Sequence, residues 1–253
     1  MRADQLLVER GLAASRSQAQ RLIAAGVQWR LAPGDWKLVH KNGDELRETV
    51  ELQLLNTSEA RYVSRGGLKL EGALQHCDLQ VAGFRCLDVG QSSGGFTDCL
   101  LQAGAAQVVG VDVGQGQLAP SLQANTRVVC IEKCNARELT PEQLLQRGGP
   151  RAQAPFDLVV GDLSFISQTL VWPALVPLLA PGGHMLLLVK PQFELQPEHI
   201  GKGGLVKDAG LYDVVQARIQ DTCQTLGLQC KHYFESAITG GDGNREFFVW
   251  ACQ

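Results

Sequence analysis

Short apolar runs alternate with helix-like stretches through most of the chain. Five such runs span residues 84–90, 107–112, 127–131, 156–162 and 184–190, and each has a length typical of a buried strand. The stretches between them have helical character, as in residues 96–104, where Gly104 ends the predicted helix. Strands that alternate with helices predict an α/β fold built on a doubly wound, mostly parallel sheet.

The C-terminal part of the chain departs from this alternation. Residues 233–238 and 246–250 predict two further strands, joined by a tight turn at residues 240–244. A closing hairpin inserts an antiparallel strand into the sheet, as in the seven-stranded, Rossmann-like sheet of class I methyltransferases. A nucleotide dehydrogenase would keep that edge parallel. The glycine-containing segment 195–207 predicts a mobile substrate loop near the open end of the sheet.

The first 56 residues predict a separate small α+β domain. Residues 3–10 and 16–25 have helical periodicity, and Ser15 with Gln18 matches a capping box at the start of the second helix. Turn residues then separate three short predicted strands, at residues 27–31, 36–39 and 49–55.

Composition supports two folded domains. The chain divides into residues 1–56, a polar linker at 57–62, and a large domain at 63–253. Hydrophobic residues make up 45% of the sequence, which is enough for a substantial core and excludes a disordered chain. The net charge of −3 does not indicate a nucleic-acid partner, but residues 10–41 contain six Lys or Arg and one acid. Such a basic segment attracts phosphate, although a solvated surface explains it equally well.

The cysteine and histidine patterns predict no metal site. The eight cysteines form no CxxC pair, Cys130 and Cys134 have no second pair to complete a zinc site, and the histidines show no HExxH spacing. The charged opening of the chain does not resemble a signal peptide. No run approaches the ~18 apolar residues that a membrane span needs. These features predict a cytoplasmic protein with reduced, mostly buried thiols.

The first predicted strand ends in a glycine loop that indicates a nucleotide cofactor. Asp88 precedes Gly90 and Gly94, and Asp112 ends the next strand 22 residues after Gly90. The loop is not GxGxxG, and an acid before the first glycine is a poor neighbour for a diphosphate but a good one for an ammonium group. Asp112 is placed to hold ribose hydroxyls. The pattern favours S-adenosylmethionine over NAD, and the alternative is a glycine-rich turn without a ligand.

Four charged residues are predicted to meet at the open end of the sheet. They are Lys69, Asp162, Lys190 and Glu246, each expected near a strand end or in a loop beside it. Two cations and two carboxylates in one cleft suit the removal of a proton from a weakly acidic hydroxyl. The alternative is a pair of surface salt bridges with no chemical role.

Six sequence blocks resemble one family. They are residues 63–70, 87–98, 111–118, 162–167, 190–194 and 243–248. In this order they resemble the TlyA family of ribosomal RNA ribose methyltransferases, which is related to FtsJ and in which some members are labelled haemolysin A. The segment that includes Ser15, Arg16 and Gly26 is similar to a small RNA-binding domain shared by a ribosomal protein and some pseudouridine synthases.

The resemblance implies roles for individual residues. Lys69, Asp162, Lys190 and Glu246 fall on the family's catalytic set, and Lys190 is expected nearest the ribose 2′-oxygen, as a base or as an electrostatic stabiliser. The implied S-adenosylmethionine ligands are Asp88, Gly90, Gly94, Asp112 and Asn135. The RNA-binding candidates are Arg16, Arg21, Lys37 and Arg65. The chain departs from the family at Gln91, usually a small residue, and at the turn 31–36, which lacks the usual Val-Asn-Gly.

The resemblance also implies a partner, which is ribosomal RNA or a ribosomal subunit. Family members methylate cytidine riboses in the large subunit alone or in both subunits. Those that modify both carry extra residues at each end, so the large subunit is expected here. The competing hypotheses are a base methyltransferase, a membrane-active haemolysin and a non-catalytic ribosome-binding protein. The residues Asp162-Leu-Ser-Phe after the fourth predicted strand argue against the first, since it would usually have Asn-Pro-Pro-Tyr or a catalytic cysteine.

Overall fold

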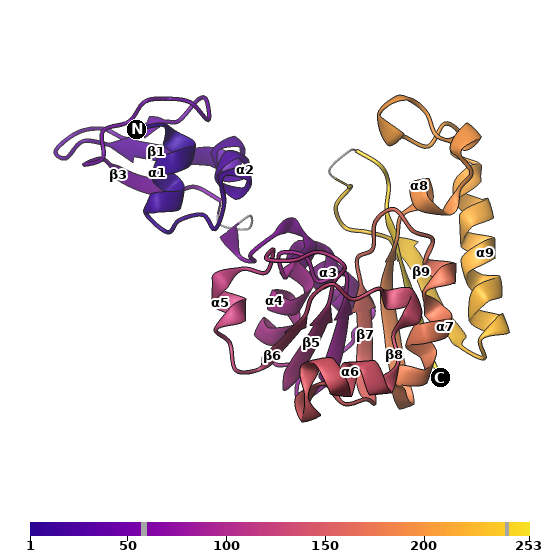
Figure 1. Cartoon of the computed structure of the whole chain (residues 1–253). Helices are drawn as coiled ribbons and strands as arrows, with labels where there is room; N and C mark the ends of the chain where they lie inside the picture. The colour runs from indigo at the N-terminus through magenta and orange to yellow at the C-terminus, as the bar shows by residue number, and fades with distance from the viewer. Residues whose placement is uncertain (57–59, 241–242) are drawn as a thin grey trace. The chain divides into compact units, whose positions relative to one another are not determined.

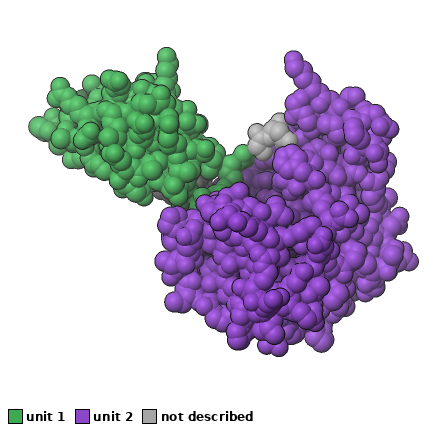
Figure 2. Space-filling model, viewed as in Figure 1, with its two compact units in different colours: residues 1–65 green, residues 66–253 purple. Residues whose placement is uncertain are grey.

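The computed structural model describes residues 1–56, 60–240 and 243–253. These form two compact units, Met1–Arg65 and Gly66–Gln253 (Figure 2). Residues 60–65 therefore group with the first unit, whereas the sequence suggested a linker at 57–62. Part of that linker, residues 57–59, and part of the predicted turn, residues 241–242, lie outside the described residues.

The first unit packs two helices on a small antiparallel sheet. Its elements are α1 (Ala3–Glu9), α2 (Arg16–Gly26), β1 (Val27–Arg30), β2 (Lys37–Leu38) and β3 (Glu51–Leu54), and the strand order is β2-β1-β3. Leu6, Leu7 and Leu22 are at most 1% exposed and belong to a core of this unit's own. An independent core of this kind is the mark of a separate domain.

At the start of α2, the serine of the predicted capping box forms its hydrogen bond. Ser15 Oγ accepts a hydrogen bond from the N–H of Gln18 (3.2 Å), as predicted. The side chain of Gln18 also bonds to two backbone groups outside the helix. Its Oε1 accepts from the N–H of Ala14 (2.6 Å), and its Nε2 donates to the carbonyl of Tyr62 (2.9 Å). This buried glutamine therefore ties the start of α2 to the end of the same unit.

The second unit contains the predicted sheet of seven strands, in the order β6-β5-β4-β7-β8-β10-β9 (Figure 1). The strands are β4 (Arg85–Val89), β5 (Gln107–Val111), β6 (Val128–Ile131), β7 (Phe156–Gly161), β8 (Leu179–Val189), β9 (Gln229–Glu235) and β10 (Phe247–Cys252). The pairs from β6 through β8 are parallel, and β10 is antiparallel to both β8 and β9. The inserted antiparallel strand is confirmed.

Two strands, β8 and β9, differ most from the prediction. β8 begins at Leu179, five residues early, because Leu179 pairs with Phe156 before an irregularity in the β7–β8 ladder. β9 covers 229–235 instead of 233–238, because its ladder with β10 starts at Gln229 opposite Cys252. Pairing partners far away in sequence set both boundaries, and local composition does not report them.

Helices cover both faces of this sheet (Figure 1). The larger ones are α3 (Arg65–His76), α4 (Gly95–Gln102), α6 (Pro141–Gly148) and α9 (Leu211–Thr225), with short α5 (Pro120–Gln123), α7 (Trp172–Leu175) and α8 (Pro191–Glu194). Residues of α6, α7 and α9 share one buried cluster with alternate strand residues such as Val159 and Leu187. On the opposite face, Phe96 of α4 stacks near Phe248 of β10.

Candidate active site

The carboxyl edge of the parallel strands gathers the predicted catalytic residues. Asp162 directly follows β7 and Lys190 directly follows β8. Glu246 directly precedes β10, which runs antiparallel with Phe247 opposite Val189, so that Glu246 comes next to Lys190 in the ladder. The fourth residue, Lys69, comes from α3 and contacts Glu246 directly. Sites at this edge are the rule for open α/β sheets.

The four side chains form two ion pairs. Lys190 Nζ lies 2.5 Å from Asp162 Oδ1, and Lys69 Nζ lies 2.5 Å from Glu246 Oε2. The side chains of Lys69 and Glu246 are 10% and 4% exposed, and those of Lys190 and Asp162 are 11% and 25% exposed. These are not the solvated surface salt bridges of the alternative hypothesis. Desolvated pairs are costly to bury, and removing one partner leaves an uncompensated charge.

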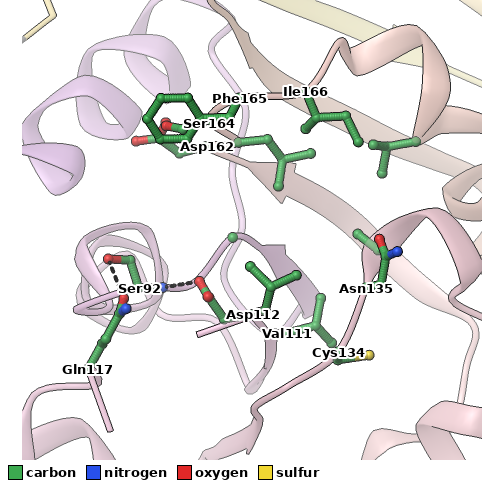
Figure 3. A pocket seen from close by; sticks show the side chains of 15 residues that line it. Ser92, Val111, Asp112, Gln117, Cys134, Asn135, Asp162, Ser164, Phe165 and Ile166 are labelled. Carbon is green, nitrogen blue, oxygen red and sulfur yellow. Dashed lines mark hydrogen bonds between the residues drawn. The ribbon is translucent and has the colours of Figure 1, made fainter. Parts of the chain in front are cut away.

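A cavity of about 470 Å³ opens beside this edge. Its volume lies within the ~300–1,000 Å³ typical of small-molecule sites. The segment Asp162–Ile166 forms one side, and Ser92, Asp112, Val111, Cys134 and Asn135 lie across from it (Figure 3). Most of this lining is apolar, with a few polar groups, so that the cavity suits a ligand with a flat ring and a polar sugar.

Asp112 is fixed at the end of β5 by two backbone hydrogen bonds. Its Oδ2 accepts from the N–H of Ser92 (2.7 Å; Figure 3). Its Oδ1 accepts from the N–H of Gly114 (2.6 Å). Each carboxylate oxygen keeps a further lone pair for a ligand hydroxyl. Asn135, across the same cavity, accepts from the N–H of Arg137 (3.1 Å). The structure therefore brings two of the three predicted polar cofactor residues, Asp112 and Asn135, to one cavity.

Gly90 lines the cavity at a position where a larger residue does not fit. Its φ is +83°, and a Cβ at this position would lie 2.7 Å from the carbonyl oxygen of Asp162. The loop after β4 thus passes unusually close to the end of β7. This close approach connects the cofactor loop to the segment that carries a proposed catalytic carboxylate.

Asp88 and Gly94 were predicted to touch the cofactor, but neither is among the cavity-lining residues of the described chain. Asp88 is 1% exposed, and its Oδ2 accepts a hydrogen bond from Thr97 Oγ1 (2.6 Å). Burial raises the pKa of Asp88 to about 7. Gly94 begins α4 with a φ of +93°, and a Cβ there would collide with Leu122 and Leu118. Both residues support the loop from behind.

Gln91, the departure from the family pattern, is accommodated inside the fold. It is 3% exposed, and its Nε2 donates to Thr97 Oγ1 (2.9 Å), which extends the hydrogen-bond chain to Asp88. Its side-chain amide occupies the space beside Gly110 of β5, where a Cβ would lie 1.9 Å from the Gln91 Cδ atom. A glycine in the neighbouring strand therefore makes room for the larger loop residue.

Sequence reasoning assigned no role to several residues of the site. Ser164 Oγ accepts a hydrogen bond from Lys190 Nζ (2.9 Å). Phe165 is 90% exposed, has a left-handed φ of 64°, and lines the cavity, as does Cys134. An exposed aromatic in a strained conformation indicates function. Ser164 and Phe165 belong to the family block 162–167, which was the only signal for them.

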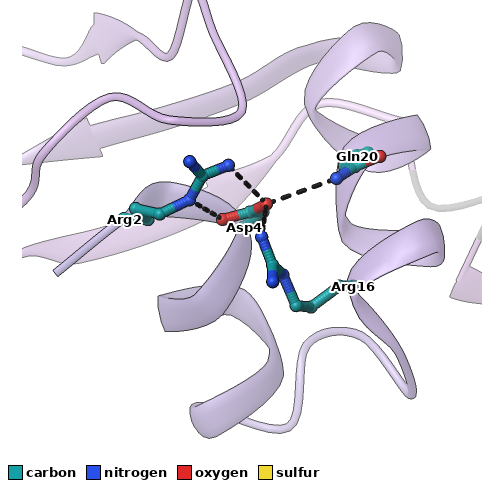
Figure 4. A network of polar contacts seen from close by, with 4 residues as sticks. All are labelled: Arg2, Asp4, Arg16 and Gln20. Carbon is teal, nitrogen blue, oxygen red and sulfur yellow. Dashed lines mark hydrogen bonds and ion pairs between the residues drawn. The ribbon is translucent and has the colours of Figure 1, made fainter.

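The RNA-binding candidates lie on three different elements. Arg16 reaches the buried carboxylate of Asp4 (3.1 Å), which also binds Arg2 and Gln20 (Figure 4). The Arg2 guanidinium holds the pKa of Asp4 well below its usual range. The other candidates are Arg21 on α2, whose guanidinium donates to the carbonyl of Ser17, Lys37 on β2, and Arg65 at the start of α3.

Arg16 therefore has a structural task in the first unit. Its side chain is nevertheless 55% exposed, so the guanidinium also faces solvent.

In the residues that the structure describes, no cluster of three or more His, Cys, Asp or Glu side chains could hold a metal ion. Across the same residues, no helix combines the length and apolarity of a membrane span.

Comparison with known proteins agrees with the geometry. Residues 62–252 match the model of the FtsJ-like methyltransferase family. The 16S/23S rRNA (cytidine-2′-O)-methyltransferase TlyA of Mycobacterium tuberculosis is 45% identical over 249 residues, which cover 98% of this chain and 88% of that one. The chain is a TlyA-type member of the FtsJ-like methyltransferase family. Its cofactor is S-adenosylmethionine, as the sequence predicted.

Two further similar proteins have names that differ from that of the Mycobacterium tuberculosis enzyme. The 23S rRNA (cytidine-2′-O)-methyltransferase TlyA of Campylobacter jejuni is 31% identical over 83% of this chain and 78% of its own length. A solved structure from Streptococcus thermophilus, labelled as a hemolysin, is 37% identical with a TM-score of 0.75. It covers all of this chain and 88% of that one.

Proposed function

We propose that this TlyA-family enzyme transfers a methyl group from S-adenosylmethionine to the ribose 2′-hydroxyl of a cytidine in ribosomal RNA. The observation that supports it best is the position of the Lys190–Asp162 pair. Asp162 lines the cofactor cavity, and Lys190 Nζ lies 2.5 Å from Asp162 Oδ1. A group that handles a hydroxyl proton must lie beside the methyl donor. A ribosomal RNA substrate places the enzyme in the cytoplasm.

The cavity residues fit the cofactor. Asp112 would hold the ribose hydroxyls, Asn135 and the apolar lining would hold the adenine end, and Gly90 gives the loop its close path past Asp162. When bound, the cofactor supplies an electrophilic methyl group on a good leaving group. The protein's own tasks are therefore to align the two reactants and to manage one proton.

Lys190 is the residue we assign to the 2′-oxygen. Asp162 and Ser164 hold its amino group from two sides, at 2.5 and 2.9 Å, so that its position is well defined. In one role a neutral Lys190 accepts the hydroxyl proton, and in the other the ammonium stabilises the forming alkoxide. Lys69 and Glu246 form the second pair along the same edge, and we assign them to the orientation of the ribose.

The first unit is proposed to bind the RNA. In its β1–β2 ribbon the guanidinium of Arg30 lies 4.6 Å from the ring of Trp36, and Lys37 Nζ lies 5.5 Å from the ring of Trp29. A hollow of about 710 Å³ is lined by both tryptophans and Lys37. Aromatic rings beside cations are what unpaired nucleotides stack on. We therefore propose that the turn 31–36, which departs from the family pattern, binds RNA through Trp36.

We further propose the large ribosomal subunit as the target. The test is to map ribose methylation on both ribosomal RNAs from cells with and without this protein. A cytidine 2′-O-methyl group that disappears from the large-subunit RNA alone is the expected result. Loss from the small-subunit RNA as well would give the enzyme the dual target. A membrane-active protein or a non-catalytic ribosome-binding protein would leave both maps unchanged.

The cofactor assignment predicts the effect of Asp112→Ala. The loss of hydrogen bonds to the ribose should weaken adenosylmethionine binding by about 1–3 kcal/mol, the usual cost of unmet polar groups. Calorimetry with adenosylmethionine, adenosylhomocysteine and NAD measures it. The unchanged protein should bind the first two and not NAD. The exposed Asp221→Ala on α9 is a control that should keep full affinity. Tight binding of NAD would contradict the cofactor assignment.

A further inference from the structure

A buried glutamate outside the four charged residues connects the two segments that carry the Lys190–Asp162 pair. Glu194 ends α8, four residues after Lys190, and is 3% exposed. Its Oε2 accepts a hydrogen bond from Ser167 Oγ (2.5 Å), and its Oε1 accepts from the N–H of Gln168 (2.7 Å). Both carboxylate oxygens are therefore used to hold the segment that begins at Asp162.

A second connection runs parallel to the first. The side chain of Gln168 donates to the carbonyl of Leu188 in β8 (2.8 Å) and accepts from the indole of Trp172 (3.3 Å). On the other side, Arg218 of α9 donates to the backbone carbonyl of Glu194. The end of the 162–168 segment is thus tied to β8 and α8, on either side of Lys190, by side chains buried from water.

Holding this segment matters because its exposed part reaches the cavity. Phe165 is 90% exposed, and its ring lies 5.1 Å from the ring of Phe193 on α8. Asp162, Ser164 and Phe165 all lie on the segment and contact either the cavity or Lys190. An error of about 1 Å in the relative position of catalytic groups can cost roughly 10²-fold in rate.

We infer that Glu194 is a positioning residue, which fixes the segment 162–168 against α8 and so sets the geometry of Asp162 and Lys190. The inference rests on the proposed catalytic role of that pair. A carboxylate suits this task because it offers two acceptors to two donors. Glutamine keeps the size but loses the charge that strengthens both hydrogen bonds, and its amide N–H can face only Ser167 Oγ, which must then accept instead of donate.

The test compares Glu194→Gln and Ser167→Ala with the unchanged enzyme on ribosomal subunits. Glu194→Gln should lower kcat about tenfold or more and change the KM for the subunit less than about twofold, because the RNA-binding unit is untouched. Ser167→Ala, which removes one of the two bonds, should give a smaller fall in kcat. Val108→Ala is the control, since Val108 is fully buried in β5 near the opposite edge of the sheet.

Thermal unfolding of each variant separates positioning from general stability. The control should keep kcat within about twofold even if its unfolding midpoint falls as far as that of Glu194→Gln. An equal loss of kcat in both, or full kcat in Glu194→Gln, would overturn the inference. Lys190→Ala is measured alongside. If it is inactive while both Glu194→Gln and Ser167→Ala are normal, only the positioning role fails, whereas an active Lys190→Ala removes the proposed function of the pair.

Discussion

Lys190→Ala should lose methyl transfer by a factor of about 10² or more, the usual size of an acid–base contribution. Asp162 and Ser164 hold the amino group beside the cofactor cavity, and alanine removes it while every residue that lines the cavity keeps its identity. Binding of adenosylmethionine and of ribosomal subunits should change little. Single-turnover methylation with labelled cofactor measures the rate. Lys231→Ala, an exposed lysine on β9, is the matched control and should keep full activity.

Lys190→Arg decides between the two roles of this residue. Arginine stays charged at any working pH, so that it can stabilise an alkoxide but cannot accept a proton. An inactive arginine variant with normal binding would favour the base, and substantial activity would favour electrostatic stabilisation. Near-normal activity in the alanine variant would refute the assignment of Lys190 altogether.

The sequence predicted which edge of the sheet carries the four charged residues, but it did not predict the contact between Lys69 and Glu246. Strand ends in a parallel sheet meet at one edge, which is enough to place Asp162 beside Lys190. The contact of Lys69 with Glu246 joins residues 177 positions apart, from a helix and from the start of an antiparallel strand. Its geometry depends on how α3 packs on the sheet, which periodicity does not specify.

The contact predicted between Asp88 and the cofactor stays a prediction, and the structure adds the hydrogen-bond partners of this carboxylate. Its place before Gly90 suggested contact with the cofactor's ammonium group. Successive strand residues point to opposite faces, however, and Asp88 points to the face where Thr97 of α4 lies. The carboxylate is enclosed there with Thr97 and Gln91. Asp112 directly follows the last residue of β5, so the alternation of strand side chains between the two faces does not apply to it. Its side chain faces the cavity.

A chain that begins at residue 57 should bind adenosylmethionine normally and fail to methylate ribosomal RNA. All residues that line the cofactor cavity and all four charged residues lie in the second compact unit. Each unit has a hydrophobic core of its own, so we expect the second to fold without the first. It also contains the basic segment and the aromatic ribbon proposed to hold RNA. Calorimetry checks cofactor binding, and methylation of large subunits checks the rest.

Salt and single substitutions then locate the RNA contacts within the first unit. Binding of the full chain to ribosomal RNA should weaken steeply as salt rises, because phosphate contacts release counterions. Trp36→Ala should weaken binding by about 1–3 kcal/mol if a base stacks on the ring, while Trp36→Phe should retain most of the affinity. If the shortened chain methylated ribosomal RNA as well as the full chain, RNA recognition would belong to the second unit, and the ribbon would need another role.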